Sequence, residues 1–139
     1  MKWLFSENGK DLGLLILRIG FGLGMVYHGY GKVMGGATGT IAFAESAGFP
    51  MPVVFGWAGA LSEFLGGIGL LLGLLTRPSA LFVSFTMVTA AFVRHLSDPF
   101  SEKELALAYL VAALCLLVAG AGQYSLDNYW FRQDSESTS

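Results

Sequence analysis

The chain has 139 residues, of which 54% are hydrophobic and 13% are charged, and its mean hydropathy is +0.60. An ordinary soluble domain has roughly 25% charged residues, so this composition indicates an integral membrane protein. A net charge of −2 without a basic patch argues against nucleic-acid binding. The single cysteine, Cys115, excludes an intrachain disulfide and a C-x-x-C motif, so redox chemistry would need an electron carrier from outside the chain.

Four long apolar segments follow one another, each close to the roughly 20 residues that a membrane-spanning helix needs. We therefore expect a single membrane domain over residues 1–139, with an all-α fold: an antiparallel bundle of four transmembrane helices. The predicted spans are about 12–34, 54–75, 79–96 and 105–121, and a polar tail follows at 133–139.

The first span begins after Asp11, which suits a helix cap, and it contains Arg18. A cleaved signal peptide is the alternative interpretation of this segment. Arg18 interrupts the apolar region, however, and no convincing small-residue cleavage site follows it. The segment is expected to remain as a membrane helix.

The connection at 35–53 is the longest in the chain. Its centre, 41–47, suits a short interfacial helix that begins after Thr40 and ends before Gly48. Such a helix would act as a lid over a cavity, whereas a plain surface loop is the simpler alternative. The next connection is short, and Pro78 suits the first turn of the third span.

Basic residues near the span ends predict the orientation of the chain. They form two groups: Lys2, Lys10, Arg77 and Arg132 on one side, and Lys32, Arg94 and Lys103 on the other. By the positive-inside rule the first side is cytoplasmic. We expect a multi-pass protein of the cell membrane with both termini in the cytoplasm.

Helical periodicity places particular residues on one face of each span. In the first span these are Arg18, Gly22, Met25, Gly29 and Lys32, with His28 beside them. In the second span they are Gly56, Gly59, Glu63, Gly66 and Gly73. Small residues allow membrane helices to approach closely, so these two faces are expected to pack together.

Arg18 and Glu63 lie inside apolar spans, where a charge costs about 2.5–3.5 kcal/mol, so each is expected to pair or to line a polar cavity. At about 1.5 Å per residue, Arg18 lies roughly 12 Å and His28 roughly 27 Å from the cytoplasmic end of the first span. Glu63 lies about 18–21 Å from the same end of the second span. The predicted partners of Glu63 are, in order, Arg18, His28 and Arg94, and Lys32 could reach it by folding back.

Two interpretations of these charges remain open. As structure, an Arg–Glu pair would orient the helices, although a buried pair is weak evidence for stability. As function, surplus positive charge in a low dielectric suits an anion or the carbonyl oxygens of a quinone. The candidate catalytic residues, which would move the proton that accompanies quinone reduction, are Glu63 and His28. The candidate substrate-binding residues are Arg18, Lys32, Arg94 and His95. A metal site at the two histidines is a weaker alternative, because their spacing offers no local ligand pair.

Short glycine-rich motifs recur over residues 10–130: Leu17-Arg18-Ile19-Gly20, His28-Gly29-Tyr30-Gly31-Lys32, Gly48-Phe49-Pro50, and a stretch from Glu63-Phe64-Leu65-Gly66-Gly67 to Gly73-Leu74-Leu75-Thr76-Arg77-Pro78. Together they resemble the DoxX family of small four-helix membrane proteins. Family members are commonly described as oxidoreductases, some as the membrane subunit of a thiosulfate:quinone oxidoreductase and others in redox-defence assemblies. The resemblance implies a membrane redox partner, and its motif residues are Arg18, His28, Lys32 and Glu63.

Three functions are compatible with these features. The first, which we expect, is an enzyme or enzyme subunit that passes electrons from a small sulfur or organic reductant to quinone, without a covalently bound cofactor. The second is a non-catalytic membrane anchor for soluble or membrane redox enzymes. The third is a small-solute or proton carrier with Glu63 as the coupling group, which would require a homo-oligomer because four helices are few for a transporter.

Overall fold

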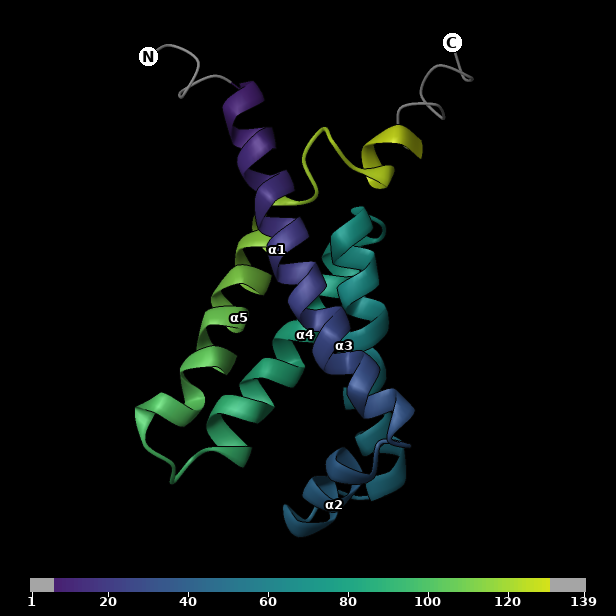
Figure 1. Ribbon diagram of the computed structural model, residues 1–139, viewed down its shortest axis with the longest axis vertical. Helices are drawn as coiled ribbons and strands as arrows, with labels where there is room; N and C mark the ends of the chain where they lie inside the picture. The colour runs from purple at the N-terminus through teal and green to yellow at the C-terminus, as the bar shows by residue number, and fades with distance from the viewer. Residues whose placement is uncertain (1–6, 131–139) are drawn as a thin grey trace.

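The computed structural model describes residues 7–130, and every long regular element within this range is helical. The helices are α1 (Glu7–Met34), α2 (Thr38–Ser46), α3 (Pro52–Leu72), α4 (Thr76–Thr89), the π-helical turn η2 (Ala90–Arg94) and α5 (Phe100–Ala119). Figure 1 shows α1, α3, α4 and α5 running lengthwise, with α2 at one end, here called the α2 end. Residues 7 and 130 lie at the opposite end, the terminal end. The predicted tail at 133–139, Lys2 and Arg132 lie outside the described residues.

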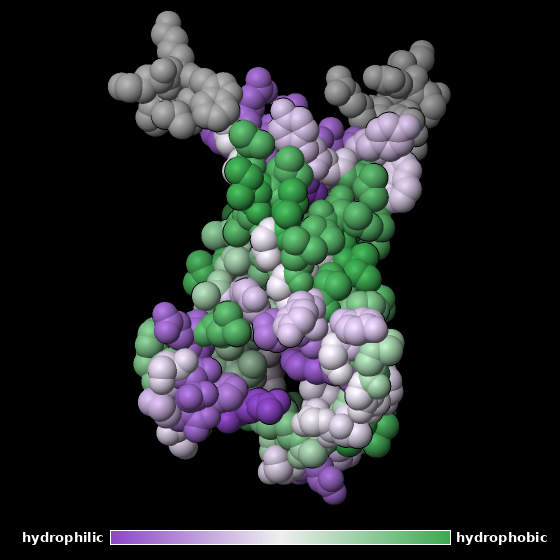
Figure 2. Space-filling model, in the orientation of Figure 1, coloured by the Kyte–Doolittle hydropathy of each residue, from purple (hydrophilic) through white to green (hydrophobic). Residues whose placement is uncertain are grey.

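Among the described residues, three helices are long and apolar enough to cross a membrane: Asn8–Met34, Pro52–Leu72 and Thr76–Arg94. The fourth long helix, α5, has 20 residues and carries Glu102, Lys103 and Glu104 near its start. Figure 2 shows a hydrophobic band between hydrophilic groups at the two ends of the molecule. The chain is therefore an integral membrane helical bundle, as the sequence predicted.

The predicted spans overlap the observed helices, and the differences lie at their ends. α1 begins at Glu7, so the prediction that Asp11 caps this helix was wrong. The Oδ1 of Asp11 instead accepts a hydrogen bond from the backbone N–H of Gln123 at 3.0 Å. This partner is distant in sequence, so no local pattern could indicate it. α5 begins at Phe100, upstream of the predicted start at 105.

A tight turn joins α3 to α4. Gly73 ends α3 with a φ of 67°, a conformation in which a side chain would be strained. Pro78 lies in the first turn of α4, as predicted. From the C-terminal part of the chain, the Asp127 carboxylate accepts hydrogen bonds from the N–H groups of Leu75 (2.7 Å) and Thr76 (2.9 Å). This contact fixes the segment around Asp127 to the start of α4.

Glycines bring α1 and α3 together in an antiparallel pair. A methyl group at Gly22 would lie 2.8 Å from the Cα of Leu71. A methyl group at Gly29 would collide with the backbone of Glu63 and Phe64. The predicted packing face of the first span is therefore correct at both glycines.

The other helix of that predicted pair, α3, is shared among three neighbours. The prediction that Gly56 and Gly66 pack against the first span was wrong. Gly56 faces Ile41 of α2, and Gly66 faces Val83 of α4, because α3 lies between these helices. The connection 35–53 contains the short helix that the sequence suggested, but α2 begins at Thr38 and not after Thr40. It packs on α3, and Gly48 follows its end with a φ of 76°. The hydrophobic core involves α1, α3, α4 and α5, and its buried residues are Phe21, Met25, Leu70, Ala80, Val83, Met87, Ala113 and Leu116.

Candidate functional site

An ion pair between Lys32 and Glu63 forms the centre of the candidate site. The Lys32 Nζ lies 2.5 Å from Oε1 and 2.6 Å from Oε2 of Glu63, so it donates to both carboxylate oxygens. The Glu63 side chain is 4% exposed, whereas that of Lys32 is 34% exposed. Gly29 lies one turn before Lys32 and permits the close helix approach that this pair requires.

The predicted order of partners for Glu63, with Arg18 first, was wrong, because Lys32 is the residue that pairs with Glu63. The register of α1 against α3 is the physical reason. Gly29 lies against Glu63, which leaves Lys32 one turn further toward the α2 end and within reach of the carboxylate. The same register places Arg18 against Gly73, at the far end of α3. An estimate from helix rise alone could not resolve this difference.

A cavity of about 410 Å³ lies beside the ion pair, within the range of about 300–1,000 Å³ that is usual for ligand pockets. We call it the central cavity. Its polar lining residues are Lys32, Thr40, Ser62, Glu63, Thr86, Thr89 and Arg94. Its aromatic lining residues are Phe43, Phe49, Phe55, Phe82 and Phe85. The cavity thus combines hydrogen-bonding and charged groups with apolar ring surfaces.

Arg94 lines the central cavity from η2, the π-helical turn that continues α4. Such turns are rare and occur frequently at functional sites. The guanidinium carbon of Arg94 lies 5.7 Å from the centroid of the Phe43 ring, which is within the range of a cation–π contact. Because Phe43 belongs to α2, this contact joins the end of α4 to the helix that covers the cavity.

The connection 35–53 forms one wall of the central cavity through α2 and the residues that follow it. Its aromatic rings contact one another in sequence: Phe43 with Phe49 at 6.3 Å and Phe49 with Phe55 of α3 at 5.3 Å between centroids. Ala44 is buried beneath them. This wall corresponds to the lid that the sequence suggested.

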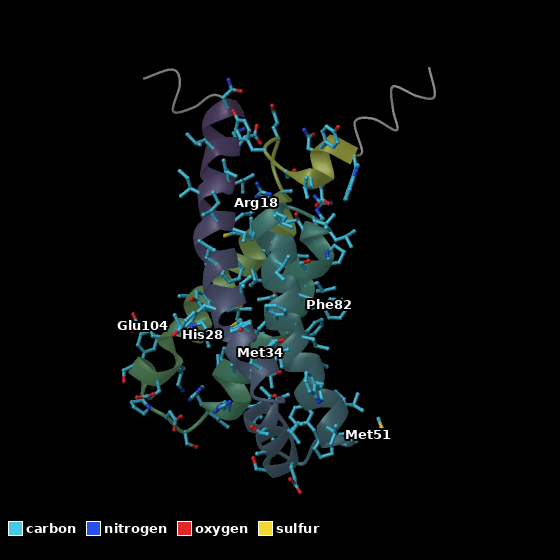
Figure 3. The ribbon with its side chains drawn as sticks, turned by 45° about the vertical axis from the view of Figure 1, so that its right-hand side comes forward. Arg18, His28, Met34, Met51, Phe82 and Glu104 are labelled. Atoms are coloured by element: carbon cyan, nitrogen blue, oxygen red, sulfur yellow. The ribbon has the colours of Figure 1, made fainter. Side chains whose placement is uncertain are left out.

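His28 borders a second cavity, of about 480 Å³, formed by the end of α1 and the start of α2. Its ring lies 6.0 Å from that of Tyr109 in α5, edge to face. Figure 3 shows His28 on the side of α1 that faces α5. Lys32 lines both cavities, so it stands between His28 and the central cavity.

Two other predicted site residues lie away from the central cavity. Arg18 is at the terminal end (Figure 3), where it is 1% exposed and donates to the backbone oxygen of Tyr124. His95 lies beyond η2, with its Nδ1 at 2.7 Å from Oδ2 of Asp98. Within residues 7–130, no cluster of three or more His, Cys, Asp or Glu side chains is arranged to hold a metal ion.

The structure therefore brings together Lys32, Glu63 and Arg94 and separates them from the other candidates. Sequence reasoning missed several lining residues, although one signal was present. The missed residues Phe82, Phe85 and Thr89 follow the spacing of a single helical face, together with Thr86, which the sequence already places on one face with Arg94. Two hydroxyl residues on a face that also carries aromatic rings indicate that this face does more than contact lipid.

Comparison with known proteins gives the family. Residues 13–96 match the sequence model of DoxX, which confirms the resemblance seen in the motifs. The chain belongs to the DoxX family. The matched segment contains the whole lining of the central cavity of this DoxX protein and ends before α5.

Three relatives cover most of the chain. Inner membrane protein YqjF of Escherichia coli (strain K12) is 36% identical over 128 residues, which is 85% of this chain and 92% of the relative. Inner membrane protein YphA of the same organism is 34% identical over 125 residues, covering 82% and 87%. A Bacillus subtilis (strain 168) protein named "Putative oxidoreductase CatD" is 29% identical over 123 residues, covering 88% and 90%. No solved structure matches the chain.

Proposed function

We propose that this DoxX-family protein binds the head group of a quinone in the central cavity and takes part in passing electrons from a small reductant to the quinone pool. The observation that supports this proposal is the Lys32–Glu63 pair in the wall of an aromatic-lined cavity. A quinone presents carbonyl oxygens on a flat apolar ring. The Lys32 ammonium suits such an oxygen as a donor, and the phenylalanine rings suit the ring.

The chemistry requires two electrons and two protons for each quinone reduced to quinol. The reductant, a small sulfur or organic compound, supplies both electrons, because the lone Cys115 offers no redox pair. In this proposal the hydrogen-bonded Lys32–Glu63 pair passes one proton to the quinone oxygen and regains it from water. Figure 2 shows a hollow with hydrophilic borders at the α2 end, through which water would supply the second proton.

The names of the relatives agree with this proposal. One is named "Putative oxidoreductase CatD" and two are named inner membrane proteins. By analogy, we place this chain in the cytoplasmic membrane of a bacterium. Its basic residues then favour an orientation with the terminal end in the cytoplasm and the central cavity toward the outer surface.

Calorimetric titration of a short-chain quinone into the purified protein tests the proposal. Lys32→Ala is expected to weaken binding at least tenfold, equivalent to about 1.4 kcal/mol, because the donor to the quinone oxygen is lost. His28→Ala is the matched control, since His28 lies on the same helix but borders the other cavity. The His28→Ala variant should change the affinity for the quinone by less than about threefold. If His28 supplies protons through Lys32, the His28→Ala variant should reduce quinone more slowly while its affinity for quinone stays close to that of the wild type.

Other outcomes would identify a different function. Unchanged affinity in Lys32→Ala would place the quinone outside the central cavity. Wild-type protein that binds no quinone and co-purifies with redox enzymes would be a membrane anchor. Proton or solute flux in proteoliposomes that disappears in Glu63→Gln would identify a carrier.

A further inference from the structure

The central cavity reaches the side of the bundle between α3 and α4. Three of its aromatic lining residues are largely exposed at the surface: Phe55 (43%), Phe82 (63%) and Phe85 (65%). All three belong to helices that are long and apolar enough to cross a membrane. Figure 3 shows Phe82 part-way along the bundle, on the opposite side of the view from α1. In a bilayer, a side opening at this height would face lipid.

Small residues on α3 keep this opening wide. Ala58 and Gly59 both line the cavity, and a methyl group at Gly59 would meet no atom within 4 Å. Toward the terminal end the gap closes at the hydrogen bond that the Thr86 hydroxyl donates to the Ser62 oxygen at 3.0 Å. Beyond it, Gly66 admits the Val83 side chain between the helices. The opening is therefore confined to the half of the α3–α4 interface that lies beside the ion pair.

The two sides of the cavity differ in chemistry. The Lys32–Glu63 pair lies at its inner wall, where a polar head group would bind. The Phe82 and Phe85 rings lie at the side opening, where an apolar chain would avoid water. A water-soluble anion entering by this opening would first have to cross lipid, at a high free-energy cost.

We infer that the ligand of the central cavity is an amphiphile carried by the bilayer, with its polar head at Lys32 and its apolar tail passing between α3 and α4 over Phe82 and Phe85. This inference rests on the proposed function and extends it, because it assigns a tail-binding subsite and a lateral route of entry. The occupant is a quinone with an isoprenoid tail. The hydrophilic hollow at the α2 end (Figure 2) then serves water and the reductant.

The experiment compares two quinones with the same head group, one without a tail and one with several isoprene units. Binding is measured in lipid nanodiscs of one composition, so that partitioning into lipid is the same for every variant. The test variant is Phe82→Ala with Phe85→Ala. The matched control is Phe92→Ala with Phe100→Ala, because these two rings are also exposed, at 53% and 64%, and do not line the cavity.

The test variant is expected to lose at least about fivefold in affinity for the tailed quinone and less than about twofold for the tail-less one, by the loss of apolar contact at the opening. The control should leave both affinities unchanged. A second variant, Ala58→Phe, narrows the opening without removing a ring and should slow the association of the tailed quinone.

The results separate this inference from the proposed function. Equal losses for both quinones, or no loss for the tailed one and no slowing in Ala58→Phe, would overturn the lateral route and leave the head-group site in place. If wild-type protein binds neither quinone, both the proposed function and the lateral route are wrong.

Discussion

Two buried charges in this bundle, Arg18 at the terminal end and Glu63 midway along α3, are stabilised in different ways. Arg18 is bound to a backbone oxygen, that of Tyr124, in a region packed closely around Gly73. Glu63 is bound to the side chain of Lys32, which borders two cavities. A backbone partner is fixed by the fold, whereas a lysine can turn toward a ligand. The space beside a buried charge, more than the charge itself, therefore indicates a binding site.

The terminal end is a network that connects distant parts of the chain. Asp11 of α1 binds the N–H of Gln123, and Arg18 binds the carbonyl of Tyr124. Asp127 donates its own N–H to the Gly73 oxygen at 2.8 Å and caps α4 with its carboxylate. The segment after α5 is thereby held against α1 and the α3–α4 turn. These contacts give Arg18 a structural role.

The largest expected effect breaks this network. Arg18→Ala removes a large, fully buried side chain and leaves the Tyr124 oxygen without its donor, so it should lower the free energy of unfolding by about 3–5 kcal/mol. Quinone affinity of the remaining folded protein should stay unchanged. Chemical unfolding in detergent measures the stability, and Arg77→Ala, an exposed residue at the same end, is the control. A selective loss of affinity would show that Arg18 belongs to the ligand site.

The helices were predictable because their signals are local. The length of each apolar segment and Pro78 in the first turn of α4 act within a few residues. Gly73, which ends α3, was instead expected on a packing face inside the second span. The partner of Glu63 was not predictable in this way. Arg18 and Lys32 share one face of α1, and only the contact of Gly29 with α3 decides which of them reaches the carboxylate.

The candidate site was predictable to a similar extent. Lys32, Glu63 and Arg94 stood out because charges in apolar segments are visible in the sequence. Phe82 and Phe85 did not, since phenylalanines on a membrane helix are equally typical of lipid contact. His95 was grouped with Arg94 by assuming that an α-helix continues through both residues. The helix instead ends in a π-helical turn at Arg94, and His95 contacts Asp98.

The next largest effect concerns the ion pair. Glu63→Gln and Lys32→Met should each lower the free energy of unfolding by about 2–4 kcal/mol, somewhat less than for a fully buried pair because Lys32 is partly exposed. The double variant should lose clearly less than the sum, with a coupling of at least about 1 kcal/mol. Unfolding of the four proteins of the cycle gives this value.

A second double-mutant cycle, with Arg18→Met and Glu63→Gln, tests whether the two buried charges are independent of each other. The two residues have separate partners, Glu63 near the middle of α3 and Arg18 beside Gly73 just beyond its end, so their effects should add within about 0.5 kcal/mol. Additive losses in the first cycle and coupling in the second would contradict the arrangement described here. They would restore Arg18 as the partner of Glu63.

The smallest expected effects on stability come from the glycines of α1, of which Gly22 contacts Leu71 and Gly29 contacts α3 at Glu63. Gly22→Ala and Gly29→Ala each force a methyl group against α3, which should lower the free energy of unfolding by about 1–3 kcal/mol. Gly20→Ala is the control, because a methyl group there meets no atom within 4 Å, and alanine should stabilise the helix by about 0.5–1 kcal/mol. Unfolding of the three variants under the same conditions compares these values.

Quinone titration of the same three variants then shows which of the two contacts between α1 and α3 affects the binding site. Gly29→Ala should weaken binding severalfold, because moving α1 away from Glu63 also moves Lys32, one turn further along the helix. Gly22→Ala shifts α1 near Leu71, toward the terminal end, and should leave the affinity close to that of the wild type. Equal weakening in both variants would mean that α1 moves as one rigid body. The binding site would then depend on the packing at both ends of the bundle.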